Sequence, residues 1–304
     1  GVPALLVLLF LSIPPLELLP PCKVNLLLNI LGRRADGFHE LETVLLPVPL
    51  HDRLTLAPAP AGVALTCSDP ALPTDAGNLV HRAATAFLRE ARLERGVTLH
   101  LEKNLPLAAG LGGGSANAAV TLRGLNELFG RPLPPERLVA VAAALGSDVP
   151  FFLQDGPALG TGRGEVIEPL PPFPALRGAE LVRVHPGLGI ATAWAYRELA
   201  RHPAARHGRP GRAAELIAPL QAGDLPAAGR ALYNSLEAPA LRKFPVLALY
   251  QEFFRAHGAA ATLMSGSGST TFAVFPAADQ AAAAAAAFAE RFGRTAWLQR
   301  AALA

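Results

Sequence analysis

Short apolar runs bounded by turn residues predict several β-strands in the first third of the chain. The runs 23-KVNLLLNILGRR-34 and 41-LETVLLPVPL-50 favour two strands, and the Ala-Asp-Gly between them is typical of a turn. Further β structure is expected over 51–60 and 62–68, and 96–106 is expected to be a strand that ends at a proline. This part of the chain therefore predicts a sheet-rich region.

Apolar residues at helical spacing predict helices beside these strands. The segment 78–93 has a suitable N-cap in Asn78, and 115–130 and 134–146 follow the same pattern. In the second half, 180–187 favours a strand and 276–293 an alanine-rich helix. Residues 262–275 predict a second glycine loop followed by a strand. We therefore expect an α+β protein with strands in both halves.

A proline-rich stretch, 169-PLPPFPALRG-178, suggests a boundary between an N-terminal domain, 20–168, and a C-terminal domain, 169–304. The apolar residues 1–19 are expected to be an extension outside the core that leads into the first strand. They lack a basic region, and prolines at 14, 15, 20 and 21 leave no uninterrupted apolar run that could span a bilayer. A signal peptide is the alternative.

The stretch 105-LPLAAGLGGGSANAAV-120 places four glycines within five positions directly before a predicted helix. Free N–H groups at a helix start attract anions, and glycine lets a ligand approach the backbone closely. Residues 106–116 are therefore either a phosphate-binding loop or a tightly packed turn. The Walker pattern is excluded because no lysine precedes Ser115, and the dinucleotide-binding pattern fails because Ser115 replaces its third glycine.

Charge and composition narrow the class of ligand. The formal net charge is +3 without a Lys/Arg run, which suits a local site for a phosphorylated small molecule better than a nucleic-acid-binding tail. Lysine occurs only at positions 23, 103 and 243, so these residues are candidates where a compact ammonium is needed. The two cysteines, Cys22 and Cys67, have no metal-binding spacing and indicate a cytoplasmic protein without a disulfide framework.

Three motifs, in order, resemble those of the GHMP superfamily, named for galactokinase, homoserine kinase, mevalonate kinase and phosphomevalonate kinase. They are 21-PCKVNLLLNILGRRADGFHELETV-44, 106-PLAAGLGGGSANAA-119 and 264-MSGSGSTTFAVF-275. The resemblance implies an α+β two-domain kinase with a ribosomal-protein-like N-terminal domain and a ferredoxin-like C-terminal domain. It also implies that ATP and substrate meet between the two halves.

The segment Arg-Ala-Asp-Gly-Phe-His-Glu-Leu in the first motif resembles one branch of that superfamily. Further matches lie at 78–84, 146–153, 162–165 and 185–196, so the resemblance covers roughly residues 20 to 300. It implies ATP-dependent phosphorylation of the C2 hydroxyl of a methylerythritol that carries a cytidine diphosphate, in non-mevalonate isoprenoid precursor synthesis.

The same resemblance implies roles for individual residues. Asp148 matches the catalytic aspartate, which accepts or orients the hydroxyl proton, and Lys23 matches the lysine paired with it. A turn-capping Asp148 and a surface Lys23 are the structural alternatives. ATP is expected at the central motif and at two further positions: Pro106, Leu107, Ala108, Ala109, Gly110, Leu111, Gly112, Gly113, Gly114, Ser115, Ala116, Asn78 and Lys103. For Asn78 and Lys103, an N-cap and a surface lysine are the alternatives.

Five positions match the substrate-binding pattern. Phe38 and Tyr196 are expected to flank the cytosine and His39 to read its edge. Asn25 and Thr192 are expected near the diphosphate or erythritol part. Mg²⁺ is expected with ATP, but no carboxylate stands out as its ligand, so we predict no metal-binding residue.

Two other functions stay open from the sequence. A sibling small-molecule kinase of the superfamily would lack the cytosine pocket, and a non-catalytic nucleotide-binding protein would not need both Lys23 and Asp148. We expect a small-molecule substrate, no nucleic-acid or membrane partner, and a monomer or homodimer.

Overall fold

The structure, a computed structural model, describes residues 14–303. They divide into two compact units that interleave along the chain, and each is described by itself. The described part of unit 1 comprises residues 14–22, 50–105 and 113–154, and that of unit 2 comprises 23–49, 106–112 and 155–303. Within 14–303, no helix is long and apolar enough to cross a membrane.

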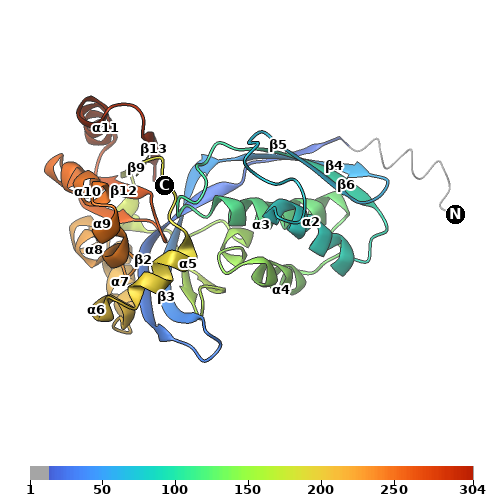
Figure 1. The fold of residues 1–304 in the computed structure, drawn as a ribbon, viewed down its shortest axis with the longest axis horizontal. Helices are drawn as coiled ribbons and strands as arrows, with labels where there is room; N and C mark the ends of the chain where they lie inside the picture. Colours follow the sequence, from blue (N-terminus) through green and yellow to red (C-terminus); the bar gives the residue numbers. More distant parts are fainter. Residues whose placement is uncertain (1–13, 304) are drawn as a thin grey trace. The chain divides into compact units, whose positions relative to one another are not determined.

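Unit 1 is built on a four-stranded sheet with helices packed against it (Figure 1). The strand order is β1 (Leu16–Leu18), β4 (Arg53–Ala59), β6 (Gly96–Glu102) and β5 (Val63–Cys67). Only β5 and β6 are parallel among the pairs of this sheet. Its helices are α2 (Leu79–Glu90), α3 (Gly113–Leu128), α4 (Pro135–Leu145) and the short 3-10 helix η1 (Pro150–Leu153).

Burial alternates along the central strands of this sheet, because one face packs on helices and the other is more open. Leu54 and Leu56 of β4 and Leu99 of β6 are buried, whereas Thr98 and His100 are exposed. Helix α3 packs on β4 and β1, and α2 packs on α3. The close approach of α3 to the sheet requires a glycine: a Cβ on Gly124 would lie 2.4 Å from Leu18 Cδ1.

Unit 2 contains two sheets. The first has the order β10 (Tyr233–Asn234), β2 (Pro21–Arg33), β3 (His39–His51), β7 (Ala158–Thr161) and β8 (Val166–Pro169). The second has the order β11 (Ala261–Met264), β12 (Thr271–Phe275), β9 (Glu180–His185) and β13 (Trp297–Ala302), and all its pairs are antiparallel.

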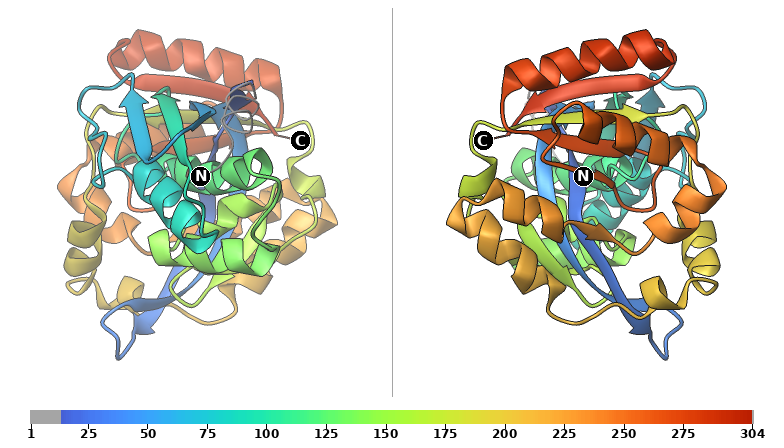
Figure 2. Two further views of the ribbon diagram at one scale, coloured as in Figure 1. Left: turned by 90° about the vertical axis from the view of Figure 1, so that its right-hand side faces the viewer. Right: turned by 90° about the vertical axis from the view of Figure 1, so that its left-hand side faces the viewer.

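The second sheet of unit 2 has a ferredoxin-like order. Counted along the chain, its first strand, β9, lies between the third, β12, and the fourth, β13. Helices α10 (Val246–Ala256) and α11 (Ala278–Phe292) cover the sheet through Phe254 and Phe288, and Figure 2 shows α11 in red along it.

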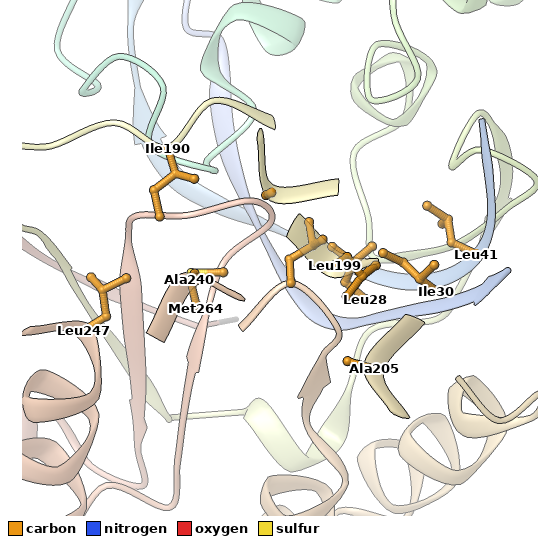
Figure 3. Close-up of a cluster of buried hydrophobic side chains, with 11 residues drawn as sticks. Leu28, Ile30, Leu41, Ile190, Leu199, Ala205, Ala240, Leu247 and Met264 are labelled. Carbon is orange, nitrogen blue, oxygen red and sulfur yellow. The ribbon is translucent and has the colours of Figure 1, made fainter. Parts of the chain in front are cut away.

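The remaining helices of unit 2 are α5 (Thr192–Leu199), α6 (Pro203–Arg206), α7 (Arg212–Ala222), α8 (Leu225–Ala231), α9 (Glu237–Lys243) and the 3-10 helix η2 (Pro174–Leu176). Helices α5, α6 and α9 contribute residues to a second apolar cluster. The cluster joins Leu28 and Ile30 of β2 to Leu41 of β3, Leu199 of α5 and Met264 of β11 (Figure 3). It fixes the position of β2, which carries two predicted site residues.

Most predicted elements are confirmed with shifts of a few residues at their ends. The helix expected over 115–130 begins at Gly113, so Ser115 lies in its first turn and not at its cap. The region 262–275 was expected to be a loop and a strand, but it begins with a second strand, β11, which pairs with β12.

The compact units and the predicted domain limits divide the chain in different ways. Residues 16–18, within the expected extension 1–19, form strand β1 on the edge of the sheet, and residues 1–13 lie outside the described residues. The units interleave, whereas the prediction draws one boundary between 168 and 169. That boundary stays a prediction.

Candidate functional site

Lys23 and Asn25 lie on β2 in unit 2 and are both buried, with 3% of each residue exposed. Lys23 Nζ donates to Asn25 Oδ1 at 2.5 Å and to the Gly110 carbonyl at 3.0 Å. Asn25 Nδ2 donates to Thr43 Oγ1 at 2.9 Å. A buried ammonium is costly unless it is hydrogen-bonded, so these contacts hold Lys23 in one place beside the glycine loop.

The loop from Pro106 to Gly112 packs against the third predicted motif, also in unit 2. Ser265 Oγ donates to the Gly110 carbonyl at 2.9 Å, and the Thr270 N–H donates to the Ala109 carbonyl at 3.1 Å. Asn234 Nδ2 in turn donates to the carbonyls of Met264 and Gly266, at 2.7 and 2.8 Å. The structure therefore brings the first, central and last predicted motifs together around Lys23.

Gly110 is required at its position for two reasons. Its φ is +77°, in the left-handed region, and a Cβ there would lie 2.0 Å from the Ser265 carbonyl oxygen. Ala108 has φ +50° without being a glycine, which marks the loop as conformationally unusual. The loop thus follows a path that a run of ordinary residues would not adopt.

In unit 1, helix α3 begins with the remaining glycines of the motif, Gly113 and Gly114, and the Lys103 ammonium lies beside its first residue. Lys103 Nζ lies 3.6 Å from the place where a Cβ on Gly113 would stand, so the ammonium adjoins the first residue of the helix. Ser115 is half-buried in the first turn, and Ala116 is fully buried. A helix N-terminus and an ammonium both favour an anion.

Lys103 is not the surface residue of the structural alternative. It forms a buried ion pair with Asp52, whose side chain has no exposed surface. Asp52 is a residue that the sequence analysis did not single out. It is a single residue between two strands, and the side chains that it binds come from residues 51 and 65 positions later in the chain. Its interactions therefore follow from the fold and not from a local sequence motif.

Asn78 caps helix α2 as the pattern predicted. Its Oδ1 accepts from the Val80 N–H at 2.9 Å, and its Nδ2 donates to the Pro73 carbonyl at 2.9 Å. The N-cap interpretation is therefore confirmed, and any contact of Asn78 with a nucleotide stays a prediction.

His39 and Tyr196, in unit 2, lie ring against ring. Their centroids are 4.9 Å apart and their planes are inclined by 38°. Burial lowers the pKa of His39 below its usual range, and the positive charges of Arg33 and Arg206 lower it further. His39 is thus favoured as a neutral imidazole, which can both donate and accept a hydrogen bond.

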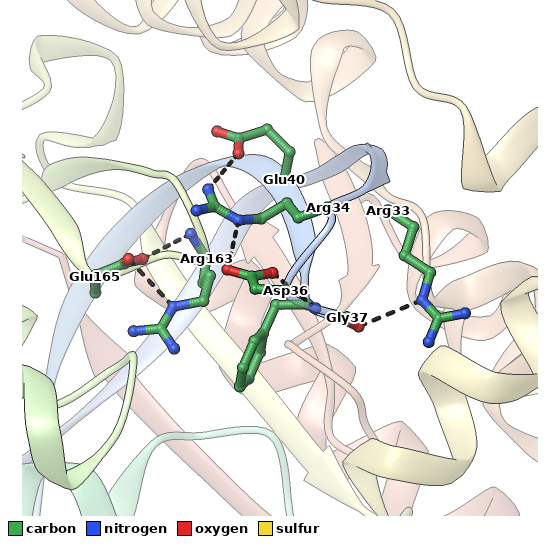
Figure 4. Close-up of polar contacts among 8 residues, drawn as sticks. Arg33, Arg34, Asp36, Gly37, Glu40, Arg163 and Glu165 are labelled. Atoms are coloured by element: carbon green, nitrogen blue, oxygen red, sulfur yellow. Dashed lines mark hydrogen bonds and ion pairs between the residues drawn. The ribbon is translucent and has the colours of Figure 1, made fainter.

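Phe38 stands at the turn between β2 and β3 with 52% of its surface exposed. The guanidinium of Arg163 lies over its ring, 4.6 Å from the centroid, and Glu165 holds that arginine through a hydrogen bond of 3.2 Å (Figure 4). On the turn itself, Arg34 pairs with Asp36 and Glu40. An exposed aromatic ring on a braced turn can stack on a flat ligand; the sandwich of Phe38 and Tyr196 stays a prediction.

Thr192 and Asp148 complete the predicted set. Thr192, the first residue of α5, has its Oγ1 3.0 Å from Ser267 Oγ in the third motif. Asp148, in unit 1, lies half-buried in the turn between α4 and η1. The structure thus places Thr192 beside the loop of the third motif, and Asp148 on a short turn between two helices.

No group of three or more His, Cys, Asp or Glu side chains among residues 14–303 could hold a metal ion. Mg²⁺ binds few protein ligands and keeps phosphate and water oxygens. The Ser115 hydroxyl, in the first turn of α3, fits that kind of site as a single oxygen ligand.

Comparison with known proteins gives consistent matches along the chain. The model of the GHMP kinases N terminal domain matches residues 78–156, and that of the GHMP kinases C terminal domain matches residues 216–294. A 4-diphosphocytidyl-2-C-methyl-D-erythritol kinase of Synechococcus sp. (strain JA-3-3Ab) is 43% identical over 88% of this chain and 87% of its own length. The kinase of the same name from Geobacter sp. (strain M21) is 39% identical over 89% and 93%.

Solved structures show the same likeness. A crystal structure of 4-(cytidine 5'-diphospho)-2C-methyl-D-erythritol kinase aligns with a TM-score of 0.75 and 36% identity, over 95% of this chain and all of the other. Homoserine kinase from Cytophaga hutchinsonii aligns with a TM-score of 0.76 at 21% identity over 96% of both chains, which shows the fold alone.

Proposed function

Since the chain belongs to the 4-diphosphocytidyl-2-C-methyl-D-erythritol kinases, a family of GHMP kinases, we propose that Lys23 and Asp148 carry out its phosphoryl transfer. The chain uses ATP to phosphorylate the C2 hydroxyl of 4-diphosphocytidyl-2-C-methyl-D-erythritol, a step of non-mevalonate isoprenoid precursor synthesis. Phosphoryl transfer of this kind needs a positioned positive charge and a base for the acceptor hydroxyl.

One observation carries the assignment of Lys23. Its ammonium is buried and donates to the carbonyl of Gly110, so the lysine of the first motif is bonded to the loop of the central motif. An ammonium in a desolvated position stabilises negative charge far better than one in water. Lys23 therefore supplies positive charge as the acceptor hydroxyl becomes an alkoxide.

Asp148 acts as the general base. A carboxylate accepts the proton of the C2 hydroxyl as the oxygen attacks the γ-phosphorus of ATP, and a positioned base of this kind contributes about 10²- to 10⁴-fold to the rate. Asp148 is half-buried on the turn between α4 and η1, so the residue is only partly withdrawn from solvent.

ATP binds along residues 106–116. The free N–H groups at the start of α3 and the ammonium of Lys103, which adjoins Gly113, together attract its phosphates. Asn78, whose side chain caps α2, contributes on the nucleoside side. Ser115 Oγ, in the first turn of α3, would be the oxygen of this chain available to an Mg²⁺ ion bound with ATP, and such an ion would supply positive charge next to the transferred group.

The cytidine end of the substrate binds in unit 2. Phe38 and Tyr196 stack on the base, and neutral His39, packed on Tyr196, donates to or accepts from its edge. Asn25, on β2 beside Lys23, and Thr192, beside Ser267, contact the erythritol or diphosphate part. Both cysteines are free thiols, which supports a location in the reducing cytoplasm. A monomer or homodimer stays a prediction.

The test is an ADP-release assay with three acceptors side by side: 4-diphosphocytidyl-2-C-methyl-D-erythritol, mevalonate and homoserine. Preferred turnover of the first supports the function, because the other two have no cytosine for Phe38, His39 and Tyr196 to bind. Release of ADP only with mevalonate or homoserine would contradict it, as would the absence of turnover with all three.

A further inference from the structure

Asp52 lies between β3 and β4 and has no exposed surface. Its Oδ1 accepts from the backbone N–H groups of Asn104 and Leu105, at 2.8 and 2.9 Å. Its Oδ2 accepts from Asn117 Nδ2 at 2.9 Å and pairs with Lys103 Nζ. A buried carboxylate is costly unless its lone pairs are used and its charge is balanced, and here both oxygens are fully engaged.

The partners of Asp52 stand at the two ends of the glycine loop. Lys103, Asn104 and Leu105 come directly before residues 106–112, and Asn117 lies in α3 directly after them. One carboxylate therefore holds the strand end that enters the loop and the helix that leaves it, and both ends belong to unit 1.

Lys103 has an unusual electrostatic position. Its ammonium adjoins Gly113 at the start of α3, where the helix dipole already places partial positive charge. A cation is normally favoured at the opposite end of a helix. The Asp52 carboxylate supplies the negative charge that keeps Lys103 there, and the arrangement suits a site that receives an anion.

We propose that Asp52 is a positioning residue for ATP, which holds the Lys103 ammonium at the start of α3 and fixes both ends of the glycine loop. This inference rests on the proposed function, in which residues 106–116 bind ATP. Asp52 acts through Lys103 and the backbone and does not itself touch the nucleotide.

The experiment measures ATP binding by calorimetry in the absence of the cytidyl acceptor. Asp52→Asn keeps the side-chain shape, but its amide cannot balance the charge of Lys103 or accept from Asn117 in the same orientation. We expect ATP to bind about tenfold more weakly, as for the loss of one charge-assisted contact. The KM for ATP should rise alongside, while the KM for the cytidyl substrate stays within about twofold of wild type.

Asn126→Ala is the matched structural control. Asn126 lies near the other end of α3, where its side chain bonds to the N–H and the carbonyl of Leu133, both at 3.0 Å. Its loss destabilises the same helix of the same unit without touching the loop. If Asp52→Asn only lowers the melting temperature and leaves ATP affinity unchanged, as Asn126→Ala should, the positioning role is overturned.

A double-mutant cycle tests the route through Lys103. In a Lys103→Met background, the further change Asp52→Asn should weaken ATP binding by about threefold, the effect expected for the Asn117 contact alone, and not by about tenfold, because the ammonium that it positions is gone. Full additivity of the two effects would contradict the proposal.

If Asp52→Asn does not fold, Asn117→Ala tests the positioning role of Asp52 in its place. It removes one neutral donor from the carboxylate and leaves both charges in place, so ATP should bind about threefold more weakly. Wild-type affinity in this variant would overturn the proposal. None of these binding results depends on the acceptor assay, so failure of the proposed kinase function is seen separately, in the wild-type chain.

Discussion

At the residue scale, the proposed phosphoryl transfer depends on how the side chains of Lys23 and Asp148 are held. Lys23 is buried and bonded to Asn25 and to the backbone of Gly110, so its ammonium is placed before any ligand arrives. Such preorganisation is what makes a charged group effective in phosphoryl transfer, since no reorganisation is needed during the reaction. In the proposed mechanism, Asp148 has the complementary role of receiving a proton.

Asp148→Asn should therefore lower kcat by about a thousandfold, because the amide cannot act as a base. Its shape is unchanged, so the melting temperature should stay close to that of the wild type. Steady-state kinetics and thermal unfolding measure both. Asp69→Asn is the control: Asp69 is a half-buried residue in unit 1 whose carboxylate accepts from the Ala71 N–H at 2.9 Å, and its loss should leave kcat intact. Near-normal kcat in Asp148→Asn would remove this residue from catalysis.

The site residues inside the motifs were predictable from the sequence, but the residues that hold them in position were not. Lys23, Gly110 and His39 lie in sequence motifs whose residue order and spacing indicate a function. Asp52 lies in no such motif. The Asn117 that it binds is 65 positions away in the chain and is brought near by the packing of α3 on the sheet. Arg163 lies in the matched segment 162–165, but that segment does not indicate that its guanidinium lies over the Phe38 ring.

At the element scale, locally encoded structure was predictable and pairing was not. Helix α2 begins after its Asn78 cap as expected, since capping depends on neighbours in sequence. By contrast, β10 has only two residues and exists through its parallel pairing with β2, so no local pattern could reveal it. Strand β11 was missed because four residues before a glycine loop carry too short a pattern.

The glycine loop provides the prediction at this scale. Gly110→Ala should lower the free energy of unfolding by about 3 kcal/mol or more, because the methyl group meets the Ser265 carbonyl and the φ of +77° is strained for alanine. Gly178→Ala, also in unit 2, has φ +76° with nothing within 4 Å of the added Cβ, and should cost only about 1 kcal/mol. Urea denaturation compares them.

The difference between the two variants isolates the clash, since their φ angles, +77° and +76°, are nearly equal. A loss in Gly110→Ala no larger than in Gly178→Ala would mean that the loop moves away from Ser265 at little cost. The packing of the central motif on the third motif would then be looser than the hydrogen bonds of Gly110 and Thr270 indicate.

At the scale of the whole molecule, the pH dependence of stability follows from one buried and two half-buried histidines. Burial lowers the pKa of His39, His51 and His185 below the usual value. Between that lowered pKa and the unfolded value of about 6.5, the unfolded chain binds more protons than the native one. Stability therefore rises with pH through this window and is lost as the pH falls. Glu237 acts in the opposite sense, because burial raises its pKa and its native form is destabilised as the pH rises.

His185→Gln separates these contributions. His185 is 5% exposed, and its Nδ1 accepts from the Gly187 N–H at 3.3 Å, a bond that a glutamine carbonyl can replace without titrating. Between about pH 7 and about pH 5.5, the variant should lose less unfolding free energy than the wild type, as measured by urea denaturation at both values. Because Glu237 titrates alike in both proteins, its effect cancels in the comparison. Equal losses would show that His185 accepts its proton in the native state as readily as in the unfolded one, which its burial argues against.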